Sequence, residues 1–248
     1  MTEGNRGRGS ASRDISLIYG AHAVREALAA RRRRFVALYA TANAAPRVAE
    51  LAIAAGLKPK IVDVRELTRR LGPDAVHQGL LLEATPPPGR ELEEVAPGGG
   101  LLLALDQITD PHNVGAILRT AAAFGVRALI VTERRSPEFG AVVAKAACGG
   151  LEHVEIVSVV NLARALDLLR EHGFQTVGLD SEGAERLETI PLHAPVALVL
   201  GAEDKGLRRL TRERCDAVAR LDVPGAIKSL NVSNACAVAL SVLRRRLD

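Results

Sequence analysis

Three short segments of this sequence combine polar side chains and glycines at spacings that suit a binding or catalytic site. The first, LDQITDPHNVGAILRTAAAFGV at 105–126, contains Asn113 and, six residues later, Arg119. The second is LVLGAEDKGLRRLTRE at 198–213, and the third is LDVPGAIKSLNVSNACAVAL at 221–240. Each joins an apolar run to a stretch with helical periodicity, and ligands of α/β proteins bind where strands end in such loops.

Arg119 is surrounded at helical spacing by small residues, which are Gly115, Ala116, Ala122 and Ala123. Small side chains allow another backbone or a ligand to approach that side of a helix closely, and a solvent-exposed arginine would not need them. We expect Asn113 to cap this helix and Gly125 to end it, because asparagine is favoured at helix starts and glycine just beyond helix ends.

The second segment excludes two common nucleotide sites. Gly201 and Gly206 have the spacing of a phosphate loop, but Leu207 stands where such a loop has lysine, and no serine or threonine follows. No Gly-x-Gly-x-x-Gly motif follows any predicted strand, which argues against a nicotinamide cofactor. The pattern therefore predicts a tight turn that exposes Glu203 at the carboxyl end of a strand.

The third segment predicts a buried helix with an unusually polar start. One face carries Val232, Ala235, Cys236, Ala239 and Leu240 at helical spacing. One capping side chain would satisfy the first turn, yet four candidates fall within six residues, and these are Ser229, Asn231, Ser233 and Asn234. Backbone groups freed in the preceding Pro-Gly turn can hydrogen-bond an adenine or an amino-acid moiety.

The composition of the 248 residues is that of a globular protein with a mild preference for polyanions. Hydrophobic residues make up 48%, charged residues 25% and aromatic residues only 2%, and the formal net charge is +4. Three arginine clusters, at 31–34, 208–214 and 244–246, fit a solvated surface and a polyanion-binding surface about equally. With so few aromatics, RNA binding would use arginine, backbone amides and shape. The three cysteines and six histidines lack metal-ligand spacing, so we expect no metal. No apolar run reaches membrane-spanning length, and we expect a cytoplasmic protein without membrane contact.

Periodicity divides the chain into four parts. Residues 1–14 have almost nothing to bury and predict a disordered basic tail. Residues 15–85 alternate between helical and strand patterns in a compact α/β unit, and 86–99, rich in proline and glycine, predict a linker. From 100 to 248, continuous apolar strands alternate with helices, which indicates a parallel sheet covered on both faces.

Taken together and in order, the three segments resemble the motifs of the SpoU (TrmH) family of RNA ribose 2′-O-methyltransferases. The resemblance spans about 101–248 and implies the SPOUT fold, whose α/β domain carries a trefoil knot. It also implies S-adenosylmethionine as cofactor, held by Leu200, Gly201, Gly206, Leu221 and Leu230. The catalytic residues that it implies are Asn113, Arg119, Glu203, Ser229 and Asn231. One departure is Leu221-Asp222-Val223-Pro224, where family members commonly have Ile-Pro-Met before the glycine.

The N-terminal unit resembles the small L30e-like RNA-binding domain of bacterial enzymes that methylate large-subunit rRNA, on the segments IYGAHAVREAL at 18–28 and HQGLLLEA at 77–84. The resemblance implies 2′-O-methylation of a guanosine in 23S rRNA, by a homodimer whose C-terminal helices pack together. Two alternatives remain open at this point: the same chemistry on tRNA, and a non-catalytic RNA-binding or ribosome-assembly protein. Arg119 would bind the RNA phosphate next to the target and stabilise the developing alkoxide, whether or not it accepts the proton.

Overall fold

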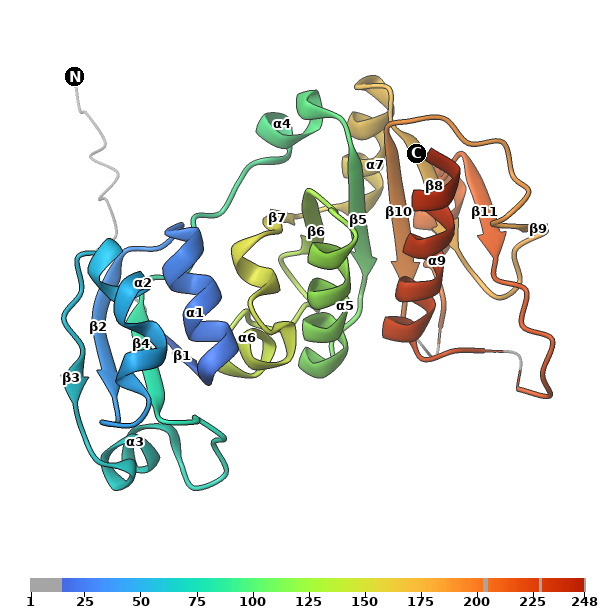
Figure 1. Ribbon diagram of the computed structural model, residues 1–248. Coiled ribbons are helices and arrows are strands. Elements are labelled where there is room, and N and C mark those ends of the chain that lie inside the picture. The colour runs from blue at the N-terminus through green and yellow to red at the C-terminus, as the bar shows by residue number, and fades with distance from the viewer. Residues whose placement is uncertain (1–14, 203–204, 228, 248) are drawn as a thin grey trace, which may run out of the picture.

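The computed structural model describes residues 15–202, 205–227 and 229–247 and contains two sheets (Figure 1). The predicted tail at 1–14 lies outside these residues. The N-terminal sheet has the strand order β1-β4-β2-β3, in which β4 is antiparallel to both neighbours and β3 is parallel to β2. Its elements are β1 (Ser16–Tyr19), α1 (Ala21–Ala30), β2 (Phe35–Ala40), η1 (Ala45–Val48), α2 (Ala49–Ala54), β3 (Lys60–Ile61), α3 (Val64–Leu71) and β4 (Leu80–Ala84).

The C-terminal sheet has seven strands, and every pairing in it is parallel, as the continuous apolar runs predict. The strand order is β7-β6-β5-β10-β8-β11-β9. The strands are β5 (Leu101–Asp106), β6 (Ala128–Thr132), β7 (Glu155–Val159), β8 (Gln175–Leu179), β9 (Glu185–Arg186), β10 (Val196–Gly201) and β11 (Ala217–Arg220). Because strands of a parallel sheet point the same way, their carboxyl ends lie along one edge.

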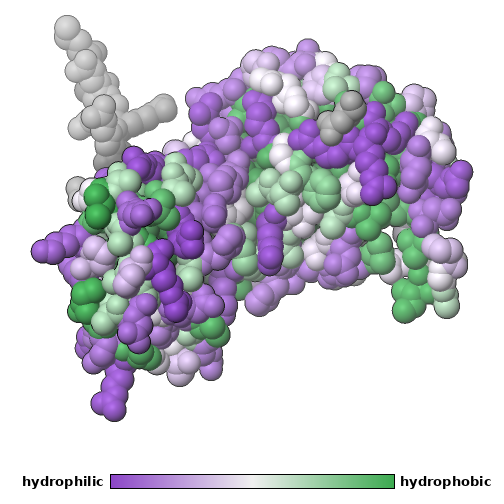
Figure 2. Space-filling view, viewed as in Figure 1, coloured by the Kyte–Doolittle hydropathy of each residue, from purple (hydrophilic) through white to green (hydrophobic). Residues whose placement is uncertain are grey.

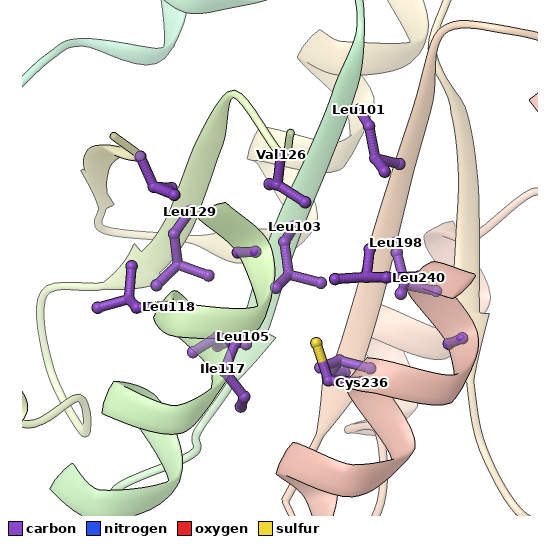
Figure 3. Close-up of a cluster of buried hydrophobic side chains, with 14 of the residues drawn as sticks. Leu101, Leu103, Leu105, Ile117, Leu118, Val126, Leu129, Leu198, Cys236 and Leu240 are labelled. Carbon is purple, nitrogen blue, oxygen red and sulfur yellow. The ribbon is translucent and has the colours of Figure 1, made fainter. Parts of the chain in front are cut away.

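Two layers of helices cover this sheet because alternate residues of each strand face opposite sides. The helices of this half are α4 (Leu92–Val95), α5 (Pro111–Ala123), α6 (Ala141–Ala147), α7 (Leu162–Glu171), α8 (Arg209–Arg214) and α9 (Val232–Leu247), with the short 3-10 turns η2 (Ala96–Gly98) and η3 (Gly150–Glu152). Leu101, Leu103 and Leu105 of β5 pack with α5, α6 and α9 on one face (Figure 3), whereas Leu102 and Ala104 pack with α4 and α7 on the other.

The predicted linker is partly built into the second domain. Leu92 and Val95 of α4 are buried in the hydrophobic cluster that also contains α7. Two apolar residues three positions apart are enough to seat one helical turn on the sheet, although proline and glycine surround them. The exposed part of the segment is therefore shorter than its composition indicates.

The start of α5 corrects one prediction. Asp110, rather than Asn113, caps the helix, because its carboxylate accepts hydrogen bonds from the backbone N–H groups of His112 (3.0 Å) and Asn113 (3.3 Å). Pro111 occupies the first helical turn, where its fixed φ suits the helix and no N–H is needed. The side chain of Asn113 is thereby released from capping.

Candidate cofactor and catalytic site

A cavity of about 330 Å³ lies where β8, β10 and β11 end and α9 begins. All five residues that the family resemblance assigns to the cofactor line it, together with Ser229. The remaining lining residues come from the same strand ends and loops, from α8 and from α9, and they include Leu179, Asp180, Ser181, Glu182, Lys205, Arg212, Val223 and Val232. Most of these side chains belong to three segments, 179–182, 200–212 and 221–235, and the parallel sheet brings the segments together at its carboxyl edge.

Glycine is needed at position 201 because two backbone segments approach each other closely there. A Cβ atom on Gly201 would lie 2.2 Å from the carbonyl carbon of Gly206 and 2.4 Å from the backbone nitrogen of Leu207. Ala202 and Gly206 exchange two backbone hydrogen bonds of 3.1 and 2.8 Å, which close the turn. Glu203 lies outside the described residues, so its predicted role stays a prediction.

Asn231 joins the first segment to the third. Its Nδ2 donates a hydrogen bond of 3.1 Å to Oδ1 of Asn113, on α5. Its Oδ1 accepts hydrogen bonds from the backbone N–H of Ser233 (2.9 Å) and from the Ser233 hydroxyl (2.6 Å) at the start of α9. Asn231 is therefore the cap among the four candidates. The same side chain also links the N-terminus of α9 to that of α5 by a hydrogen bond.

Arg119 is not among the residues of the same chain that line the cavity. Its guanidinium is exposed and donates a hydrogen bond to Sγ of Cys148 at 3.6 Å. The small residues beside it serve the packing of helices, because a Cβ on Gly115 would lie 2.4 Å from the Cβ of Ala146 on α6. The close approach predicted from these small residues is therefore made by another helix.

Two aspartates at strand ends lie near the site but are not indicated by the sequence motifs. Asp180, after β8, lines the cavity and accepts a hydrogen bond of 2.9 Å from Arg212. Asp106, whose side chain is fully buried at the end of β5, accepts hydrogen bonds from the backbone N–H (2.9 Å) and Nε (2.5 Å) of Arg208. The sequence signal for both pairs has two parts. An aspartate stands at the end of a buried apolar run, and an arginine-rich segment follows later in the chain, at 208–214.

The unusual Asp222 points away from the cavity. Its carboxylate lies 3.5 Å from Nη1 of Arg186, whereas its neighbours Leu221 and Val223 both line the cavity. Alternate residues of an extended segment face opposite sides, so the departure from the family pattern leaves the lining residues in place.

Two of the three cysteines have thiols that burial makes unreactive. Burial raises the pKa of the Cys215 thiol and of the Cys236 thiol to about 12, so both thiols stay protonated at neutral pH. Within the described parts of the chain, histidine, cysteine, aspartate and glutamate side chains form no group able to hold a metal ion. In those same ranges, no helix is both long enough and apolar enough to cross a membrane.

Comparisons with known proteins point to one family. The sequence model described as "SpoU rRNA Methylase family" matches residues 100–241, and that described as "RNA 2'-O ribose methyltransferase substrate binding" matches 17–89. The 23S rRNA (guanosine-2'-O-)-methyltransferase RlmB of Pseudomonas aeruginosa is 44% identical over 240 residues, which cover 92% of this chain and 96% of the relative. RlmB of Coxiella burnetii is 38% identical over 249 residues, covering 94% and 97%.

Solved structures have the same fold. An rRNA methyltransferase from Sinorhizobium meliloti superposes with a TM-score of 0.80 at 25% identity, over 95% of this chain and 89% of that one. The SpoU methyltransferase AviRb from Streptomyces viridochromogenes, in complex with the cofactor AdoMet, superposes with a TM-score of 0.76 at 22% identity, over 93% and 89%. With the three motif segments, the parallel sheet and these matches, the chain belongs to the SpoU rRNA methylase family.

Proposed function

We propose that this protein transfers a methyl group from S-adenosylmethionine to the ribose 2′-hydroxyl of a guanosine in 23S rRNA. The observation that carries the proposal is the convergence of Gly201, Gly206, Leu221 and Leu230, from the loops that follow β10 and β11, on one cavity. The names of the curated relatives supply the nucleotide and the RNA, since both relatives described above are 23S rRNA guanosine-2′-O-methyltransferases. The match of residues 17–89 to a substrate-binding model supports an RNA substrate.

The cavity suits the cofactor in size and in chemistry. Its volume of about 330 Å³ lies within the range of small-molecule sites. Leu200, Leu221 and Leu230 provide apolar walls for a flat base, and backbone groups freed in the Pro-Gly turn before α9 provide hydrogen bonds. The Asp180 carboxylate offers an acceptor for a hydroxyl or an ammonium group. When bound, the cofactor supplies a methyl group on a sulfonium, which is already an activated electrophile.

The chain itself must hold the ribose hydroxyl and help to remove its proton. In this proposal, Asn231 and Asn113 fix the relative positions of the cofactor loop and α5 through their hydrogen bond of 3.1 Å. Ser229, which lines the cavity, contacts the substrates, and Glu203 holds the 201–206 turn. Arg119 binds the RNA phosphate beside the target ribose and stabilises the alkoxide that develops on the 2′-oxygen.

The proposal includes the architecture that the family resemblance implies. The C-terminal domain, 100–248, would be a SPOUT domain with its loops threaded in a trefoil knot, and residues 15–85 an L30e-like domain. Two subunits would pack through α5 and α9, over which weakly hydrophobic residues gather in Figure 2 and where Val238 is 43% exposed. A dimer would bring the exposed Arg119 close to a second chain, and sedimentation velocity distinguishes dimer from monomer.

The test is methyl transfer from labelled S-adenosylmethionine to unmodified 23S rRNA and, separately, to bulk tRNA. Mass spectrometry identifies the labelled nucleoside, and Arg119→Ala and Arg119→Lys are measured beside the wild type. We expect label in 2′-O-methylguanosine of rRNA, lost with alanine and strongly reduced with lysine, because lysine lacks the planar fork. Label in tRNA alone would overturn the substrate, and absence of both transfer and cofactor binding would favour a non-catalytic RNA-binding protein.

A further inference from the structure

One arginine of the basic run at 31–34 is buried rather than solvated. The side chains of Arg33 and Glu152 are only 1% and 3% exposed, and Nη2 of Arg33 lies 2.7 Å from Oε1 of Glu152. Nε of Arg33 also donates to both carboxylate oxygens, at 2.8 and 3.1 Å. Buried charges are costly unless they are paired, and this pair joins the loop between α1 and β2 of the N-terminal domain to the C-terminal domain.

Further contacts connect the same two surfaces. Glu26 of α1 lies 2.8 Å from Nε2 of His153, and its side chain packs against Gly149, where a Cβ would lie 2.5 Å from the Glu26 Cγ. Nζ of Lys145 lies 5.7 Å from the ring centroid of Tyr19 on β1. β1 lies against α6, as Figure 1 shows, and α1 contacts η3. On the C-terminal domain, the contacts of the N-terminal domain are thus concentrated in residues 145–155, which we call the docking segment.

The docking segment also supports the helix that carries Arg119. Sγ of Cys148 accepts the hydrogen bond from the Arg119 guanidinium. A Cβ on Gly150 would lie 2.7 Å from the carbonyl oxygen of Leu118 and 3.1 Å from the backbone nitrogen of Arg119. The segment therefore touches the N-terminal domain on one side and Arg119, by side chain and backbone, on the other. A close-packed segment of this kind transmits displacement because it has no room to absorb it.

We propose that Arg33 and Glu152 are positioning residues for Arg119. The pair clamps the N-terminal domain onto the docking segment, and the docking segment holds α5 and the Arg119 side chain in the geometry that methyl transfer requires. The N-terminal domain thus acts on the chemical step as well as on RNA binding. This inference rests on the proposed function, which gives Arg119 its catalytic role.

The experiment removes the ion pair between Arg33 and Glu152 without changing the size or shape of either side chain. Glu152→Gln in the full chain leaves Arg33 buried without its counter-ion. We expect kcat for rRNA methylation to fall about ten- to a hundredfold, the effect of a displacement near 1 Å at a reacting centre, with the Kd of S-adenosylmethionine unchanged. Hydrogen–deuterium exchange in the docking segment and in the second half of α5 should rise. The matched control is Arg69→Met, which breaks an exposed ion pair within the N-terminal helix α3 and should keep the wild-type kcat and exchange.

A second variant keeps the test decisive if the unpaired charge unfolds the protein. Arg33→Met with Glu152→Leu replaces the pair by apolar side chains, which often keeps a buried contact intact, and it should restore both kcat and protection from exchange. Wild-type kcat in Glu152→Gln, or lost kcat with unchanged exchange in the docking segment, would overturn the inference. An inactive wild type would instead refute the proposed function, and the exchange comparison would still decide whether the pair holds the docking segment and α5.

Discussion

Replacing Gly201 by alanine tests whether the close approach of the 201–206 turn builds the cofactor site. The new Cβ would lie 2.2 Å from the carbonyl carbon of Gly206, whereas carbon atoms in contact are about 3.5 Å or more apart. The turn must therefore move by about 1 Å. That movement strains the two backbone hydrogen bonds between Ala202 and Gly206, each with a net contribution of about 1 kcal/mol.

We expect Gly201→Ala to lose about 2 kcal/mol of unfolding free energy, which lowers Tm by about 4–8 °C in a chain of this size. Binding of S-adenosylmethionine should weaken by tenfold or more, because Leu200, Gly201 and Gly206 all line the cavity. Differential scanning fluorimetry measures the first effect and isothermal titration calorimetry the second. The control is Gly89→Ala, at which a Cβ meets nothing within 4 Å. Wild-type affinity and Tm in Gly201→Ala would refute both the steric reasoning and the placement of the cofactor.

Three further predictions concern the interior. Asp106→Asn removes the buried carboxylate that holds Arg208 and should cost about 2 kcal/mol in urea unfolding; an unchanged midpoint would mean that solvent already screens the pair. Leu103→Ala, in the core of Figure 3, should cost about 3 kcal/mol, again by urea unfolding. The thiols of Cys215 and Cys236 have a pKa of about 12 in the fold and about 8.5 in the unfolded chain. Because the fold favours the protonated thiol, its contribution to stability is fully present below about pH 8.5 and is lost as the pH rises toward 12. In Cys236→Ala, the unfolding free energy measured with urea should therefore decrease less steeply between about pH 9 and pH 11 than in the wild type. An equal decrease in both proteins would contradict this.

The sequence predicts the parallel sheet well because its central strands β5, β6 and β10 are buried on both faces and are almost continuous apolar runs. It also predicts α9, because the apolar residues recur at helical spacing: Val232, Cys236, Ala239 and Leu240 are buried on one face. It misses α6, which has only seven residues and almost no polar face and is defined by its packing against Gly115. It also misses β1, because Tyr19 and the following helix share one apolar pattern.

The candidate site is predicted at the level of segments and less well at the level of contacts. Spacing identifies the three loops, but the bond between Asn113 and Asn231 joins residues 118 positions apart, and no local pattern encodes such a contact. For the same reason, the burial of Arg33 is invisible in a run of four arginines. Its partner, Glu152, lies 119 positions away in a different domain.

The strand order also governs how the protein can be made. β5 lies between β6 and β10, and Leu101 pairs with Val196, which the ribosome adds 95 residues later. Until then, the leucine-rich β5 presents an unpaired edge, a feature that favours aggregation of nascent chains. Pairing over so long a loop is also intrinsically slow. Newly made chains should therefore depend on chaperones until β10 emerges, and the cavity, whose walls follow β8, β10 and β11, can form only after the start of α9 has been made, because Val232 and Ala235 also line it.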